Sequence, residues 1–201
     1  MINVSPRETA PKNSELQAHS VWRASVYLAR HIGSILSPYI HGIPWTESSH
    51  ASVPRLDALE LGAASGLSGI SLAVVLSKNN LKGHGVTVTL SDYPDPSILR
   101  SNINRNSFLI DPAVMMKVVG HVWGSTPTSG AGISRGQYDL IMAADVLWLR
   151  IQHENLLTTP QNHSRPTDSN LEIDPTIVIV SGLHTGRYVI SHFLDLAECG
   201  R

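Results

Sequence analysis

The sequence predicts an α/β protein in which helices flank a parallel sheet. Short apolar stretches rich in β-branched residues alternate with segments of helical periodicity. The first of these stretches runs directly into a glycine-rich turn at 62–66, and the later ones are apolar enough to be buried on both faces. This alternation is typical of the α/β class.

The chain has the size of one ordinary domain. It contains 201 residues, of which 42% are hydrophobic, so a substantial core can form. Only 15% of the residues are charged, which argues against a disordered chain or a coiled coil. Residues 1–19 are polar and lack periodicity. We therefore expect a flexible N-terminal leader at 1–19 and one folded domain over 20–201.

The expected helices and strands alternate along the chain. Ser20 is a candidate N-cap for an amphipathic helix that ends near 37–38. Strands are expected at 55–61, 86–90, 115–119, 138–145 and 176–181, and further helices at 67–76, 97–106 and 153–157. Residues 125–137 are expected to form a loop. Residues 158–175 contain three prolines and little periodicity, so no helix is expected there.

Charge and composition exclude several classes of partner. A formal net charge of −1 gives no global attraction to nucleic acid or to an anionic membrane. No apolar run is long enough to span a membrane, and the N-terminus shows no apolar signal-peptide core. The single cysteine, Cys199, cannot form an intramolecular disulfide, so a reducing, cytoplasmic location is expected.

Metal and hydrolase chemistry find little support in the motifs. The ten histidines form no HxH, HExxH or His/Cys cluster, so no metal site is expected. A GxSxG nucleophile elbow around Ser65 would need glycine at the position of Ala63. The hydrolase interpretation therefore fails.

The turn GAASG at 62–66 is the strongest candidate binding site. A strand that turns at once into a helix needs small residues, because a ligand must approach the amides at the helix N-terminus. Asp92 closes the next strand, and a carboxylate there can accept both hydroxyls of a ribose. A plain packing turn uses the same residues, and Asp92 could instead cap a helix before Pro94 and Pro96.

The glycine spacing discriminates between nucleotide ligands. Dinucleotide-binding turns read GxGxxG, and GAASG departs from that pattern, so pyrophosphate binding is poorly supported. An adenosyl ligand without phosphates is easier to accommodate. A NAD-dependent oxidoreductase is the weaker alternative.

Eight short motifs occur in a fixed order along the chain. They are VWRA at 21–24, LELGAASGL at 59–67, SDYPD at 91–95, NINRN at 102–106, VWG at 122–124, ADVLW at 144–148, HENL at 153–156 and SGLHTGR at 181–187. This ordered set resembles the class I, seven-β-strand S-adenosylmethionine-dependent methyltransferases. More narrowly, it is similar to the protein-lysine methyltransferase group, whose fungal members are often labelled nicotinamide N-methyltransferase-like.

The resemblance implies S-adenosylmethionine as the cofactor and residues that bind it. The implied cofactor-binding residues are Trp22, Glu60, Gly62, Ala64, Gly66, Asp92, Tyr93, Trp123 and Ala144. Gly62 and Gly66 would cradle the methionine and ribose part, and Asp92 would bind the ribose hydroxyls. Tyr93 and Trp123 would lie beside the adenine, where a flat aromatic ring can stack.

The implied catalytic residues are Asp145 and Trp148. They form the family's acidic-x-x-aromatic motif, with Trp where Tyr or Phe is usual. Asp145 would hold a lysine ammonium by charge before it loses its proton, and Trp148 would line a channel for the amine. By residue type alone, Trp22, Trp123 and Trp148 could all be core residues. His184 is expected to be a surface or helix-capping residue.

The function implied by the resemblance is S-adenosylmethionine-dependent N-methylation of a protein lysine or N-terminal amine. A translation factor is one candidate protein substrate, and nicotinamide or another small amine is the alternative acceptor. The resemblance implies a Rossmann-like, doubly wound sheet. The resembled fold continues for two more strands, whereas this chain stops at Arg201, so we expect a sheet of order 3-2-1-4-5, truncated before those strands. The open edge of the fifth strand could then pair with a second copy. A truncated, inactive homologue that only binds cofactor or a partner is the second hypothesis.

Overall fold

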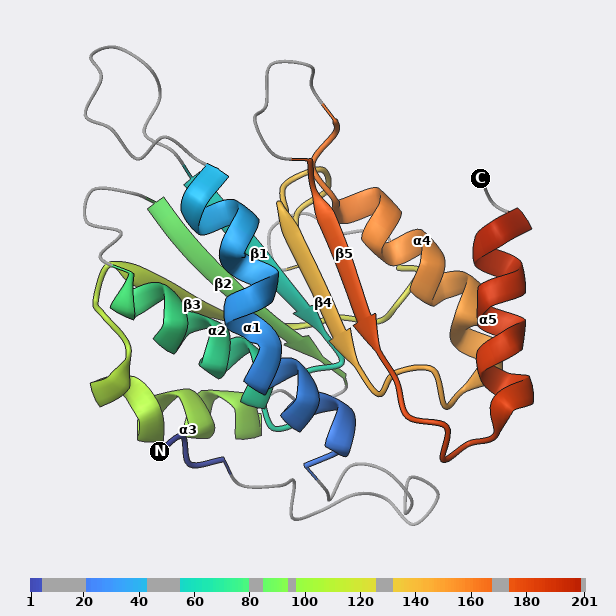
Figure 1. The fold of residues 1–201 in the computed structure, drawn as a ribbon, viewed down its shortest axis with the longest axis horizontal. Helices are drawn as coiled ribbons and strands as arrows, with labels where there is room; N and C mark the ends of the chain where they lie inside the picture. The colour runs from blue at the N-terminus through green and yellow to red at the C-terminus, as the bar shows by residue number, and fades with distance from the viewer. Residues whose placement is uncertain are drawn as a thin grey trace.

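A single parallel sheet forms the centre of the molecule (Figure 1). The computed structural model describes residues 1–4, 21–42, 55–79, 85–93, 97–125, 132–167 and 174–199. Its strands are β1 (Arg55–Leu61), β2 (Gly85–Asp92), β3 (Val114–Gly120), β4 (Leu140–Ala144) and β5 (Thr176–Val180). Their order is β3-β2-β1-β4-β5, and every pairing is parallel. The predicted fold class and the predicted strand order are confirmed.

The register aligns the carboxyl ends of the central strands. Leu61, the last residue of β1, lies opposite Ser91 in β2 and Ala143 in β4. The residues that follow these three strands therefore start side by side at one edge of the sheet. In an open parallel sheet, this is the edge where ligands bind.

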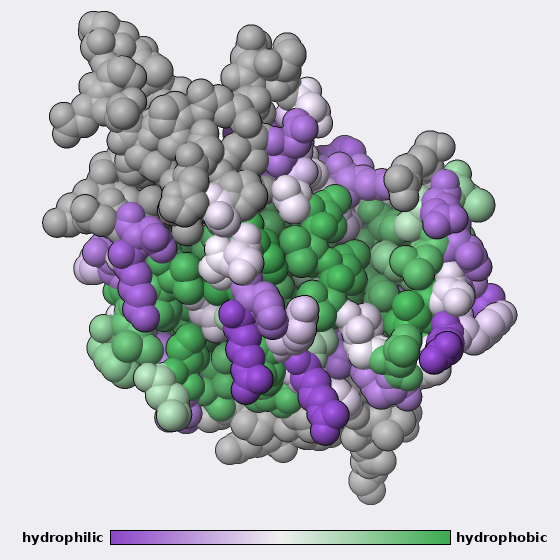
Figure 2. Space-filling model, viewed as in Figure 1, coloured by the Kyte–Doolittle hydropathy of each residue, from purple (hydrophilic) through white to green (hydrophobic). Residues whose placement is uncertain are grey.

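Helices α1 (Arg23–Gly42), α2 (Leu67–Lys78) and α3 (Ser97–Asn106) cover one face of the sheet (Figure 1). Leu28, Ile32 and Leu36 recur every four residues in α1 and are fully buried, because this spacing places them on one side of the helix. They pack in one apolar cluster with residues of α2 and of β1, β2 and β4. Figure 2 shows that hydrophobic residues remain visible across the middle of this face.

Helices α4 (His153–His163) and α5 (Arg187–Cys199) contribute to a second apolar cluster on the opposite face. Leu156 of α4 and Phe193 of α5 are buried there with the β1 residues Leu59 and Leu61. Alternate residues of β1 thus serve different clusters, since Ala58 belongs to the first. This two-sided burial explains the nearly continuous apolar character of the central strands.

Several expected boundaries were wrong. Helix α4 continues to His163, through Pro160, although only 153–157 were expected to be helical. Pro160 removes one backbone hydrogen bond, but the burial of Thr159, Pro160 and His163 against the protein favours the helix. Helix α1 likewise runs past the expected end at 37–38, to Gly42. A proline lacks only its own N–H, so the other bonds of a helix can continue.

Two further expectations concern strands and loops. The fourth strand is shorter than 138–145, because Tyr138 makes only an isolated bridge to Ser164 before β4 begins at Leu140. The described part of the expected loop, at 132–137, contains no helix or strand. Ser20 and most of the expected leader, residues 5–20, lie outside the described residues.

The first four residues are attached to α3. The backbone N–H of Asn3 donates to Asn106 Oδ1 over 2.7 Å, and Asn106 Nδ2 donates to the Asn3 carbonyl over 2.6 Å.

Among the described residues, no helix has both the length and the apolar character needed to cross a membrane.

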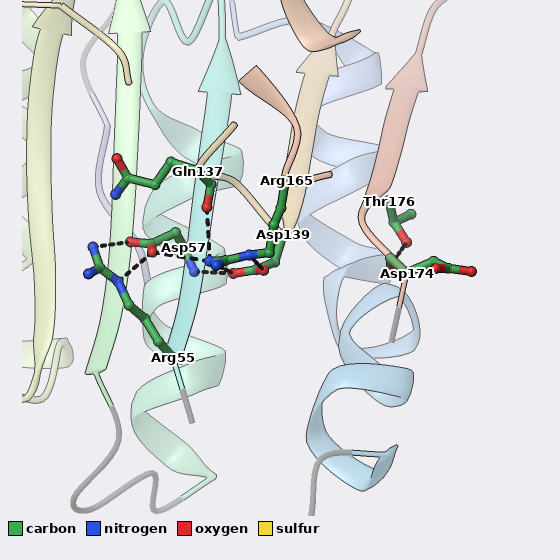
Figure 3. A network of polar contacts seen from close by, with 7 residues as sticks. All are labelled: Arg55, Asp57, Gln137, Asp139, Arg165, Asp174 and Thr176. Carbon is green, nitrogen blue, oxygen red and sulfur yellow. Dashed lines mark hydrogen bonds and ion pairs between the residues drawn. The ribbon is translucent and has the colours of Figure 1, made fainter. Parts of the chain in front are cut away.

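An ion-pair network joins β1 to β4 at the amino edge of the sheet (Figure 3). Asp57 is completely buried, and its carboxylate contacts Arg55 Nε over 2.5 Å. The backbone N–H of Asp57 donates to Asp139 Oδ2 over 2.7 Å, and Asp139 in turn pairs with Arg165 over 2.5 Å. Because each buried carboxylate has cationic or amide partners, the network can be buried without an uncompensated charge.

Candidate active site

The turn after β1 adopts backbone conformations that favour glycine. Gly62 and Gly66 have φ of +63° and +77°, and Ala64 between them has φ of +47°. A Cβ added at Gly66 would lie 2.7 Å from Leu90 Cδ2, closer than real side chains approach. A Cβ at Gly62 would lie 3.0 Å from Val146 Cγ1. Glycine at both positions therefore provides the left-handed conformation and the close packing that the turn needs.

Asp92 is bonded directly to this turn. Its Oδ2 accepts a hydrogen bond from the Ala64 N–H over 2.8 Å, and its Oδ1 accepts one from the Tyr93 N–H over 2.7 Å. The neighbouring Ala63 N–H donates to the Ser91 carbonyl over 2.9 Å. The structure thus brings the carboxylate at the end of β2 and the glycine-rich turn together. The half-buried Asp92 side chain has one fixed orientation at the carboxyl edge.

Glu60 lies beneath the turn, where its carboxylate is almost completely buried. Its Oε2 accepts a hydrogen bond from the Gly69 N–H over 2.9 Å, in the first turn of α2. Burial raises the pKa of Glu60 from 4.5 to about 7, the Gly69 N–H opposes this rise, and the Asp92 charge adds to it. Glu60 therefore faces α2, and it is close enough to Asp92 for the negative charge of Asp92 to affect its pKa.

Two aromatic residues of the predicted set have different surroundings. Trp123 is half-buried, and its ring lies against the turn, with Cζ2 3.1 Å from a Cβ built at Gly62. The Gly124 N–H donates to Thr159 Oγ1 over 2.8 Å, which fixes the segment after β3 to α4. Tyr93, by contrast, is 61% exposed. Trp123 thus forms part of the wall at Gly62, whereas Tyr93 lies at the surface of the same edge.

Asp145 follows β4 in a strained conformation. Its φ is +61°, which is uncommon for a residue other than glycine, and its side chain is only 4% exposed. The Asp145 N–H donates to the Val180 carbonyl over 2.8 Å, which holds the strained residue against the end of β5. Ala144 precedes it as the buried last residue of β4. Strained residues of this kind cluster at functional sites.

The other predicted catalytic residue, Trp148, lies nearer the surface. Its side chain is 39% exposed in the β4–α4 connection. The neighbouring Arg150 donates from Nη1 to the Tyr188 hydroxyl over 2.9 Å and lies over the Tyr188 ring at 4.8 Å. This contact fastens the β4–α4 connection to α5 and so supports the segment that carries Trp148.

His184, which the sequence predicted to be a surface or helix-capping residue, is exposed, and it also contacts two of the predicted site residues. Its Nδ1 lies 3.6 Å from Asp145 Oδ1, and its ring stacks on Trp22 with centroids 5.0 Å apart and planes inclined by 14°. Trp22 therefore reaches the carboxyl edge from the start of α1, through His184. His184 follows β5 at the same edge as Asp145, but its contact with Asp145 depends on side-chain directions that no sequence pattern gives.

A family model described as lysine methyltransferase matches residues 10–173. The chain belongs to this lysine methyltransferase family.

Several relatives of this family member carry the name of an N-methyltransferase. The protein N-terminal and lysine N-methyltransferase EFM7 of Candida glabrata is 27% identical over 155 residues, which cover 75% of this chain and 52% of the relative. The efm7 protein of Emericella nidulans is 28% identical, with 78% and 63% covered. The protein N-lysine methyltransferase METTL21A of Mus musculus is 31% identical, with 69% and 52% covered. The chain spans about half the length of most of these relatives.

Solved methyltransferase structures are also similar to this lysine methyltransferase family member. The arsenic (III) S-adenosylmethionine methyltransferase CrArsM of Chlamydomonas reinhardtii aligns with a TM-score of 0.42 and 16% identity, covering 69% of this chain and 46% of that one.

The edge that carries these residues is acidic. Asp92 ends β2 and Asp145 follows β4. Glu60 is the second-last residue of β1, and the Asp92 charge contributes to the rise of its pKa. Within the described part of the chain, no group of three or more His, Cys, Asp or Glu side chains converges as metal ligands would. An acidic edge with a flat aromatic wall can receive a ligand that carries positive charge and a planar ring.

Proposed function

We propose that this chain is an S-adenosylmethionine-dependent N-methyltransferase that acts on a protein lysine or N-terminal amine. The observation that carries the proposal is the hydrogen bond from the Ala64 N–H to the Asp92 carboxylate in a member of the lysine methyltransferase family. This bond joins a carboxylate that could accept ribose hydroxyls to a turn of small residues. The names of the relatives support the class of acceptor.

The charges at the carboxyl edge support a cationic cofactor. Burial is the main cause of the raised Glu60 pKa, and the negative charge of Asp92 adds a smaller contribution. A pyrophosphate would add negative charge beside them, whereas the sulfonium and amino groups of S-adenosylmethionine carry positive charge. We therefore favour an adenosyl sulfonium over a dinucleotide as the ligand of the candidate site. When bound, S-adenosylmethionine supplies an activated methyl group.

The proposed cofactor contacts follow from the positions of the residues. Asp92 would accept the ribose hydroxyls, since its two oxygens are already oriented by the Ala64 and Tyr93 amides. Trp123 would pack on the adenine from its position against Gly62. The remaining proposed cofactor-side residues are Trp22, Glu60, Gly62, Ala64, Gly66, Tyr93 and Ala144.

Asp145 and Trp148 are the proposed acceptor-side residues. The Asp145 carboxylate is buried and would attract a lysine or N-terminal ammonium. It would hold this group in position until the ammonium has given its proton to bulk water, which leaves the neutral nitrogen as the nucleophile. Trp148 would cover the aliphatic part of the acceptor and keep water away from the reacting nitrogen. A protein acceptor is favoured over nicotinamide by the names of the relatives.

Calorimetry and methyl labelling together test the proposal. The purified chain should bind S-adenosylhomocysteine with a micromolar Kd, and tritiated S-adenosylmethionine should label a protein of a cell lysate. Label in a lysine or N-terminal residue would support the proposal, and label only in added nicotinamide would support the small-amine alternative. Binding without any labelled product would leave the inactive homologue as the better explanation. Absence of binding would refute both.

Self-association through β5 is a separate part of the proposed function. Both edge strands are rich in apolar residues, but β3 carries Lys117, whereas β5 has no charged residue and its Ile177 is 43% exposed. A charged residue protects an edge strand against pairing, so the unprotected β5 edge is the one we expect to pair with β5 of a second copy. Light scattering should show a dimer that Ile177→Lys converts to monomer. The matched change Met115→Lys on β3 should leave the dimer intact, and a wild-type monomer at all concentrations would contradict this proposal.

We also propose a cytoplasmic location. Its support is Cys199, an exposed and unpaired thiol, which persists best in a reducing compartment. A fluorescent fusion of the full-length protein that localises to a secretory compartment would contradict it.

A further inference from the structure

Asp145 has only part of its hydrogen-bonding capacity filled. Its Oδ1 faces the Gly182 N–H over 3.4 Å and His184 Nδ1 over 3.6 Å. Within the described part of the chain, Oδ2 has no hydrogen-bond or ion-pair partner. A carboxylate that is 4% exposed has lost most of its hydration and needs polar partners in its place. In the part of the protein that the structure describes, only Oδ1 has such partners. The β5–α5 connection holds Oδ1, and Oδ2 is the oxygen left for a ligand.

His184 is itself held on two sides. Its ring stacks on Trp22 in a nearly parallel arrangement, which leaves the edge of the ring to face Asp145. Gly182 permits this position, because a Cβ added there would lie 3.0 Å from His184 Nδ1. Three segments far apart in the sequence, at Trp22, Asp145 and His184, thus meet in one arrangement.

We propose that His184 is a positioning residue for Asp145. With its proton on Nδ1, His184 would present an N–H to Oδ1 across 3.6 Å, a distance that a small shift of the ring would close to a hydrogen bond, and would so leave Oδ2 for the acceptor ammonium. Trp22 keeps the imidazole ring in the required plane. The proposal rests on the proposed methyltransferase function for the identity of the ligand, but the arrangement of the histidine proton can be tested without it.

The orientation explains how a strained backbone at Asp145 can be useful. The φ of +61° directs the side chain toward the β5–α5 connection, where Gly182 and His184 lie. A carboxylate that is fixed before the acceptor arrives loses little conformational freedom when the amine binds. Removal of the groups that orient metal ligands commonly changes affinity or activity about 10- to 100-fold, and we expect an effect of similar size for a group that orients a carboxylate.

Two substitutions at His184 separate the effect of its N–H donor from the effect of its aromatic ring. His184→Phe keeps a ring for Trp22 but removes the donor, and His184→Asn keeps an N–H donor near the place of Nδ1 but removes the ring. We expect His184→Phe to lower kcat/KM for methyl transfer to lysate protein about 10- to 100-fold, with the Kd for S-adenosylhomocysteine changed less than about twofold. His184→Asn should recover most of the lost rate. Full activity in His184→Phe, or equal losses in both variants, would overturn the proposal.

His31 provides a matched control on α1. Its ring also stacks on an aromatic side chain, that of Tyr27, with centroids 4.0 Å apart. It is exposed and has no place in the proposed site. His31→Phe should therefore leave both the transfer rate and cofactor affinity unchanged.

Nitrogen-15 NMR of the cofactor-free protein gives a readout that does not depend on turnover. At a pH where His184 is neutral, its spectrum should show the proton on Nδ1 in the wild type. In Asp145→Gly, which tolerates the positive φ, the proton should move to Nε2. An Nε2 proton in the wild type, or the same tautomer in both proteins, would refute the positioning role. If the wild type transferred no methyl group, the proposed function would fail while this spectrum still decided the role of His184.

Discussion

The Asp92 carboxylate accepts the Ala64 N–H, with Oδ2 and the nitrogen 2.8 Å apart, and this bond connects the end of β2 to the turn that follows β1. The two residues are far apart in the sequence. Ala64 adopts φ of +47°, and the Asp92 bond helps to keep its amide directed at the carboxylate. The carboxylate proposed to bind the ribose and the turn proposed to bind the cofactor are thus connected directly, so we expect a substitution in one to change the conformation of the other.

Removal of the Asp92 carboxylate should weaken cofactor binding. Asp92→Ala loses charge-assisted hydrogen bonds worth about 1.5–3 kcal/mol each, so the Kd for S-adenosylhomocysteine should rise roughly tenfold to hundredfold in calorimetry. Asp111→Ala is the matched control, because Asp111 also accepts a backbone N–H, from Ala113 over 2.8 Å, on an exposed loop. Equal affinities for Asp92→Ala and wild type would discredit the ribose assignment.

A methyl group at Gly66 should destabilise the fold. Gly66→Ala forces an alanine into φ of +77° and a contact of 2.7 Å with Leu90, so we expect a loss of about 1–3 kcal/mol in urea unfolding. Gly33→Ala is the control in α1, where a Cβ would meet no atom within 4 Å. That change should stabilise the helix by about 0.5–1 kcal/mol. If both variants had the same midpoint, the close packing at Gly66 would be disproved.

The buried Glu60 should make stability depend on pH. Because its folded pKa of about 7 exceeds its usual value of 4.5, the folded state binds more protons than the unfolded state between these values. The free energy of unfolding should therefore fall as pH rises from 4.5 to 7, by an amount on the order of 3 kcal/mol. Glu60→Gln keeps an acceptor for the Gly69 N–H and should remove this slope. The exposed Glu154→Gln should retain it, and an unchanged slope in Glu60→Gln would contradict the prediction.

The amino-edge network should matter for folding. Arg165→Ala removes the cation that pairs with Asp139 and that lies 3.7 Å from Asp57. Buried carboxylates would lose a partner, so the free energy of unfolding should fall by about 3 kcal/mol. Arg135→Ala removes only an exposed contact with Asn162 and should change stability by about 0.5 kcal/mol or less. A similarly small effect of Arg165→Ala would show that the network is unimportant for stability.

Much of the fold could be predicted because it depends on local patterns. The apolar strands and the turn at 62–66 are continuous in the sequence, and their alternation with helices restricts the topology to parallel crossovers. The end of α4 could not be predicted in the same way. Pro160 signals a helix end, and only the burial of its surroundings by distant segments reverses that signal.

The candidate site, like the fold, could be predicted from the sequence only in part. The positions of Asp92 and Asp145 at strand ends could be inferred from strand order alone, since parallel strands bring their carboxyl ends together. The Glu60 contact with Gly69 and the His184 contact with Asp145 depend on side-chain directions. Such directions follow from packing between segments that are far apart, and no motif encodes them. The resemblance identified the candidate residues, and the structure revealed how they contact one another.

The separation of the two edges has a practical consequence for protein engineering. Asp57 lies near the beginning of β1 and Glu60 near its end, and the seven residues of that strand join an edge that holds the fold together to an edge that carries the proposed chemistry. A library that seeks greater heat resistance can therefore keep Arg55 and Arg165 and vary their neighbours at the amino edge, without altering the residues proposed to contact the acceptor. A library that seeks a new acceptor can leave those two arginines untouched and concentrate on the loops after β4 and β5.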